Sequence, residues 1–142
     1  SMDSFIDVIA RAVNRSHEAE AERQEIKDLF KSLDNAVRSY SHDLVELHFD
    51  DKGCPTYEEF QNDFSIKTRI VLRSRGEPSR GTVLARGRCG EDGGYPYQLV
   101  INHEFVYCLD LQSLERRLRE LLGSAVAGRA MRELMGAPRN AA

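Results

Sequence analysis

The sequence has 142 residues, of which 41% are hydrophobic and 30% charged, a balance typical of one globular domain with a substantial core. No apolar stretch reaches the length of a membrane span. The first, residues 5–13, is short and interrupted by Asp7 and Arg11, so we expect neither a signal peptide nor a membrane helix. Three widely spaced cysteines without a CxxC pair favour reduced thiols and a cytoplasmic protein: Cys54, Cys89 and Cys108.

The net charge of −3 hides an uneven distribution along the chain. Residues 1–65 hold seven Lys/Arg against fifteen Asp/Glu, a balance of −8, whereas residues 66–142 hold thirteen against eight, a balance of +5. An acidic half and a basic half can neutralise each other within one molecule. The basic half can equally face an acidic partner.

The N-terminal third predicts one or two helices. Residues 5–14 read as helix, and a longer helix runs from about residue 17 to the low forties. The two are either separated at residues 14–16 or continuous, since the seven-residue spacing continues from one to the other. The longer helix carries an unbroken seam of apolar residues in alternating steps of four and three: Ile26, Phe30, Leu33, Val37, Tyr40, Leu44 and Leu47.

Residues 45–49 fit two structures. Val45, Leu47 and Phe49 alternate with polar residues as in a strand, but Leu44 and Leu47 also extend the helical seam. Residues 50–53 predict a turn, and residues 56–64 predict a short helix that begins with a capping box.

From residue 65, apolar and polar residues alternate with the period of two that is typical of strands. Four segments predict an antiparallel meander, because short turns join them: residues 65–75, 82–89, 97–101 and 105–109. The turn at residues 102–104 begins with Asn102, a residue that tolerates left-handed backbone conformations.

After Asp110 the helical period returns, with one apolar face over residues 111–122 and a second helix over 126–134 that Gly136 and Pro138 end. We therefore predict an α+β domain over residues 1–136, followed by a disordered tail at 137–142. It comprises a long N-terminal helix, a four-stranded antiparallel meander and a C-terminal helical pair packed on the sheet. A fifth strand is added if residues 45–49 are a strand.

The helical seam is the first candidate surface, because a long apolar stripe has to be buried against the chain's own sheet or against a second copy. Both coverings are compatible if the helix is longer than the sheet and residues 1–25 project as an overhang. The seam predicts a homodimer through helix residues Ile26, Phe30, Leu33, Val37, Tyr40 and Leu44.

A basic strand face is the second candidate. Basic residues at a spacing of two line one face of a strand, and a neighbouring strand adds two more: Lys67, Arg69, Arg73, Arg75, Arg86 and Arg88. Such a face binds nucleic acid when aromatic platforms accompany it, and only Tyr95, Tyr97 and Tyr107 are candidates. We favour the alternative that these residues form the solvated face of a one-sided sheet.

No pattern predicts an enzyme, a metal site or a cofactor. His48, Asp50, Asp51 and Cys54 lack the paired spacing of zinc ligands, and His103 with Cys108 is the one pair suited to a nucleophile and its base. We therefore predict a small non-catalytic cytoplasmic protein that binds another protein and forms a homodimer through its helices. Nucleic-acid binding is the alternative, and a secretion-type chaperone is a third by size and charge alone.

Overall fold

The computed structural model describes residues 2–49 and 68–136. A helix of 39 residues, α1 (Met2–Tyr40), is followed by the strands β1 (Val45–Phe49), β2 (Thr68–Ser74), β3 (Gly81–Arg88), β4 (Tyr97–Ile101) and β5 (Glu104–Cys108). Two shorter helices end the described chain, α3 (Leu111–Leu122) and α4 (Ala125–Leu134). The α+β class, the long N-terminal helix and the C-terminal helical pair are thereby confirmed. The short helix predicted at residues 56–64 lies outside the described residues.

The strands form one antiparallel sheet in the order β1-β2-β3-β4-β5. The prediction of four strands was one short, because residues 45–49 form an edge strand paired with β2. The helix ends at Tyr40, and the chain then reverses through His42 and Asp43, which both have positive φ. The Ser41 hydroxyl accepts a hydrogen bond of 3.0 Å from the Val45 amide and closes this reversal. The alternation of apolar and polar residues therefore decides the structure of this segment, since a strand places Val45 and Leu47 in the core.

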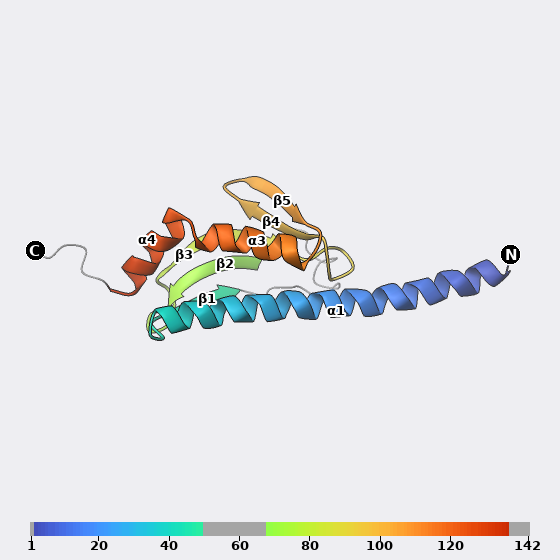
Figure 1. Ribbon diagram of the computed structural model, residues 1–142, viewed down its shortest axis with the longest axis horizontal. Helices are drawn as coiled ribbons and strands as arrows, with labels where there is room; N and C mark the ends of the chain where they lie inside the picture. Colours follow the sequence, from blue (N-terminus) through green and yellow to red (C-terminus); the bar gives the residue numbers. More distant parts are fainter. Residues whose placement is uncertain (1, 50–67, 137–142) are drawn as a thin grey trace, which may run out of the picture.

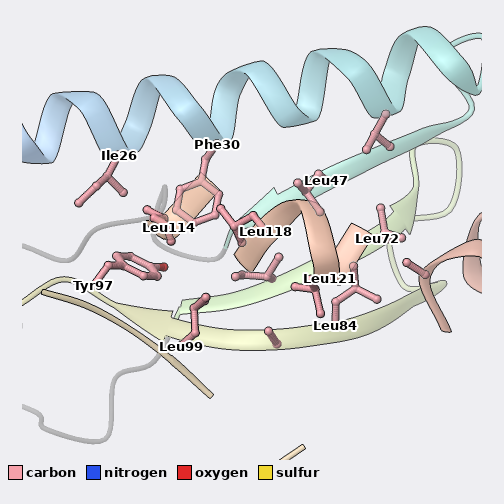
Figure 2. Packing of buried hydrophobic residues seen from close by; sticks show 14 of the residues in the cluster. Ile26, Phe30, Leu47, Leu72, Leu84, Tyr97, Leu99, Leu114, Leu118 and Leu121 are labelled. Atoms are coloured by element: carbon pink, nitrogen blue, oxygen red, sulfur yellow. The ribbon is translucent and has the colours of Figure 1, made fainter. Parts of the chain in front are cut away.

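The three described helices contribute to a single core on one face of the sheet (Figure 2). Ile26 and Phe30 of α1 point toward Tyr97 of β4 and toward the α3 leucines. The Phe30 ring is 1% exposed and lies 4.3 Å, centroid to centroid, from Phe49 of β1 and 5.6 Å from Tyr97. The apolar stripe of α3 that covers the sheet is Leu114, Leu118 and Leu121. The core residues Ile70, Leu72, Tyr97 and Leu99 therefore lie on the side of the sheet that the helices cover.

The long helix is continuous, with no break at residues 14–16, and its first turns extend beyond every other described element (Figure 1). A loop between β3 and β4 holds the helix at the point where it leaves the body. Arg15 donates to Asp92 at 3.1 Å and to Glu22 at 2.9 Å, and the Tyr95 amide donates to Glu22 at 3.3 Å. These neighbouring carboxylates raise the pKa of the Arg15 guanidinium above its ordinary value.

The C-terminal helices begin at well-formed caps. Asp110 and Ser113 form a capping box at α3, and Ser124 caps α4 by accepting from the Ala127 amide at 3.2 Å. Gly123 and Ser124 separate the two helices, in agreement with the two helices predicted over residues 111–122 and 126–134. Within residues 2–49 and 68–136, no helix is long and apolar enough to cross a membrane.

Candidate interaction surfaces

The sheet has a second face, turned away from the helices, and the register places the arginines of β2 and β3 on it. Arg69 lies directly opposite Arg86, as the spacing of the sequence predicts. The Arg88 Nε atom donates to the Gln98 Oε1 atom at 2.7 Å across the next strand pair. Lys67, the sixth predicted basic residue, lies outside the described residues. We call this side of the sheet the outer face.

Within the described residues, two of the predicted arginines pair with the same carboxylate. Arg73 Nε lies 2.8 Å from Glu46 Oε2, and Arg75 Nε lies 3.7 Å from Glu46 Oε1. The same carboxylate lies 3.4 Å from Arg38 of α1. Glu46 thus joins β1, β2 and α1, and charge at this edge of the outer face is neutralised internally. For Arg73 and Arg75 the geometry is that of a structural charge network.

Two aromatic rings stand beside the remaining arginines. In one row across the strands, Phe105 lies opposite Val100, and Val100 lies opposite Arg86. In the next row, Tyr107 lies opposite Gln98, and Gln98 lies opposite Arg88. Residues opposite each other in an antiparallel pair share one face, so both rings are on the outer face. Each ring residue is 58% exposed.

Of the three tyrosines considered in the sequence, only Tyr107 lies on the outer face. Tyr97 is buried in the core, and the Tyr95 hydroxyl donates to Glu25 of α1 at 3.2 Å. Burial and the nearby carboxylates raise the pKa of the Tyr95 phenol. Phe105 was missed, although the alternation of Phe105 and Tyr107 with Val106 and Cys108 carries the signal that places it.

The predicted helix interface is divided between the core and the surface. Ile26, Phe30 and Val37 are buried against the chain's own sheet, Leu33 is half-buried, and Tyr40 and Leu44 are exposed. Leu33, Val37 and Tyr40 also line an apolar groove of about 360 Å³ between α1 and α4, whose opposite wall includes Met131 and Met135. The seam over residues 26–37 therefore serves mainly as the chain's own core.

The apolar surface that remains uncovered lies at the other end of the same helix. Side chains from residue 4 to residue 14 are all exposed, and Ala19 is the first buried one. Five large apolar residues are more than half exposed here: Phe5 66%, Ile6 67%, Val8 51%, Ile9 63% and Val13 51%. With 3.6 residues per turn, all of these but Val8 fall on one side of the helix, and Asp7 and Arg11 fall on the other. We call residues 2–14 the projecting segment.

The structure brings no catalytic pair together at the positions considered in the sequence. His103 occupies the turn before β5, whereas Cys108 is buried at the opposite end of that strand, about 16 Å along the chain. Burial raises the pKa of the Cys108 thiol, which disfavours the nucleophilic thiolate. Within the described ranges, no three His, Cys, Asp or Glu side chains are grouped as metal ligands.

The cysteine prediction needs one correction. Cys108 is free, but Cys89 takes part in a disulfide bond, so the expectation of three reduced thiols is wrong for Cys89. Disulfide formation requires two sulfurs brought together by the fold, and wide spacing along a sequence does not exclude it.

Comparison with protein-family models, with curated proteins and with solved structures gave no match. Two surfaces of the described domain carry large exposed apolar or aromatic side chains. These are the projecting segment of α1 and the outer face of the sheet.

Proposed function

We propose that the protein is a non-catalytic interaction module that self-associates through the projecting segment of α1. The observation that supports this most directly is the row of four large, exposed apolar side chains on one side of that segment: Phe5, Ile6, Ile9 and Val13. A helix end that served only as a solvated extension would be polar all round. A contiguous apolar stripe on a protruding element is typical of an interaction site.

A second copy is the partner that fits this stripe best. The stripe is in the same seven-residue phase as the buried part of the helix, since Ala12 and Phe5 lie seven and fourteen residues before Ala19. Stripes with this spacing pack against one another as paired helices. Asp7 and Arg11, on the opposite side, remain in solvent in such a pair, so no charge is buried.

The available area predicts a weak dimer. Roughly 100 Å² of each large apolar side chain is exposed, so a two-fold contact between projecting segments buries on the order of 1,000 Å² in total. That value is at the lower limit for a specific interface. We therefore expect a dissociation constant in the micromolar range and an equilibrium between monomer and dimer.

Sedimentation velocity over about 1 to 100 µM protein tests the proposal, since this range spans a micromolar equilibrium. The wild type is expected to shift from monomer toward dimer, and Ile9→Glu is expected to remain monomeric because it places a charge in the contact. Asn14→Glu is the matched control, since it adds the same side chain to the polar side of the same exposed helix end. A wild type that stays monomeric at the highest concentration overturns self-association, as does an Ile9→Glu variant that dimerises like the wild type.

A further inference from the structure

The apolar groove between α1 and α4 lies at the end of α1 opposite the projecting segment (Figure 1). Each wall is lined at steps of three and four residues, the spacing of one side of a helix: Leu33, Ala36 and Tyr40 on α1, and Gly128, Met131 and Met135 on α4. The volume enclosed between the walls is about 360 Å³. We call this site the α1–α4 groove.

Small residues keep the groove open. A Cβ atom added at Gly128 would have no heavy atom within 4 Å, so the space beside this residue is unfilled by the described part of the chain. Glycine inside a helix is less favourable than alanine, and local helix formation therefore does not account for Gly128. At the rim, Tyr40 is 72% exposed, and tyrosine is enriched in protein interfaces. These features are typical of a surface that receives a side chain from another molecule.

The helical walls decide what kind of chain can fill the groove. Backbone groups inside a helix are already paired, so the walls offer mainly side chains to a partner. An extended peptide would leave its own backbone groups unpaired against this apolar surface, which is unfavourable. A helix pairs these groups internally, and its residues i, i+3 and i+7 span about 10 Å, the same length as the wall from Leu33 to Tyr40.

The charge at the groove favours an acidic partner. Arg132 is the charged side chain among the described residues that line it, and Arg129 is exposed nearby on α4. Within residues 2–49 and 68–136, neither guanidinium has an ion-pair partner, whereas Arg73 and Arg75 share Glu46. Carboxylates on the polar side of a bound helix would supply the missing partners.

The projecting segment of a second copy lacks this acidic character. Its polar side carries Asp7 and Arg11, whose charges cancel, and its apolar stripe is already occupied in the self-association proposed above. We propose that the α1–α4 groove binds an amphipathic helix of another protein, with apolar residues beside Gly128 and an acidic side facing Arg129 and Arg132. The groove begins about 28 Å along α1 from the end of the projecting segment, so its occupancy does not depend on self-association.

Methionine methyl groups give a readout at the groove itself. The chain has three methionines, of which Met131 and Met135 line the groove and Met2 lies at the far end of α1. The probe is a helical peptide of about 18 residues with leucines at i, i+3 and i+7 and glutamates on its polar side. With ¹³C-methyl methionine in the protein, this peptide is expected to shift the NMR signals of Met131 and Met135 and to leave that of Met2 in place. A peptide with lysines in place of the glutamates is expected to bind more weakly.

Two substitutions test the hollow and the charge separately. Gly128→Leu fills open space and is expected to weaken binding of the glutamate peptide at least about 10-fold without unfolding the domain, which circular dichroism checks. Gln112→Leu is its matched control, since it adds a leucine to an exposed position of α3 outside the groove. Arg132→Glu is expected to weaken binding of the glutamate peptide and to strengthen binding of the lysine peptide, each about 3- to 10-fold. Arg116→Glu, on the exposed side of α3, is the control for this charge reversal.

Several results overturn the proposal. One is a glutamate peptide that leaves the Met131 and Met135 signals unmoved at about 1 mM, and another is equal binding of this peptide to the wild type and to Gly128→Leu. Equal binding of the two peptides would contradict an acidic partner. Loss of self-association in Gly128→Leu, measured by sedimentation velocity, would show that a second copy occupies the groove. Shifts produced by dodecanoate but by neither peptide would assign the groove to a small amphiphile.

Discussion

The most direct test of how α1 is used compares the same substitution at its two ends. Phe30 is 1% exposed and contacts the rings of Phe49 and Tyr97, whereas Phe5 is 66% exposed. Removing a buried phenylalanine ring leaves a cavity and costs about 3–5 kcal/mol, and two aromatic contacts place Phe30→Ala in the upper part of that range. Phe5→Ala removes a ring that is already in solvent, so its cost is expected to be below about 0.5 kcal/mol.

Urea unfolding followed by circular dichroism measures both values. A domain of this size has a free energy of unfolding of roughly 7–20 kcal/mol, so Phe30→Ala is expected to remain folded in water with a lower midpoint and an unchanged m-value. Protein at about 1 µM or below keeps self-association from adding to the stability of the wild type. Equal losses for the two variants would refute the division of α1 into a buried and a projecting part. A loss below about 1 kcal/mol for Phe30→Ala would refute its place in the core.

Three further variants test local features of the fold. Ser124→Ala removes the cap of α4 and is expected to lower the free energy of unfolding by about 1 kcal/mol, measured in urea. Gly94→Ala places a Cβ atom 2.8 Å from the Cβ of Glu22, so the loop is expected to detach from α1, which increased proteolysis near this contact would report. Hydrogen bonds from Ser113 lower the pKa of Asp110 in the folded state. The contribution of Asp110 to stability is therefore complete above its ordinary pKa, and it is lost as the pH falls through the lowered pKa. Below about pH 4, the wild type is therefore expected to lose more thermal stability than Asp110→Asn does, because asparagine caps helices without titrating.

Local patterns were sufficient to predict most of the fold. The alternation in residues 97–101 and the turn at Asn102 gave β4 with its observed bounds, and the helical period gave Leu111–Leu122. The segment at Val45 was ambiguous, because its five residues fit both a strand with a period of two and the helical seam. Tertiary packing resolves it, since the core on the sheet accepts Val45 and Leu47 only when the segment is a strand.

The outer face could be predicted only in part, because its composition depends on how the strands pair. Spacing within one strand places Arg69 and Arg73 on the same face, but register between strands decides what stands beside them. A carboxylate from β1 neutralises Arg73, and an aromatic ring from β5 stands in the same row as Arg69. Neither neighbour is visible from the spacing of the arginines themselves.

The length of α1 explains why one seven-residue pattern has two different environments. A helix of 39 residues is about 58 Å long, whereas the longest strand, β3 with eight residues, is about 27 Å long. Five strands side by side span a similar distance, so the sheet covers only about half of such a helix in any orientation. The N-terminal end of the helix therefore leaves the domain, as Figure 1 shows.

Length alone, however, requires only that the helix project, and it does not require the projecting segment to be apolar. Polar residues at positions 5, 6, 9 and 13 would extend the helix equally well and would avoid the tendency of exposed apolar surface to associate. The large side chains at these positions make no contribution to the core that covers the sheet, because the first buried residue of α1 is Ala19. The proposed self-association would bury these side chains in a contact outside the core of the domain.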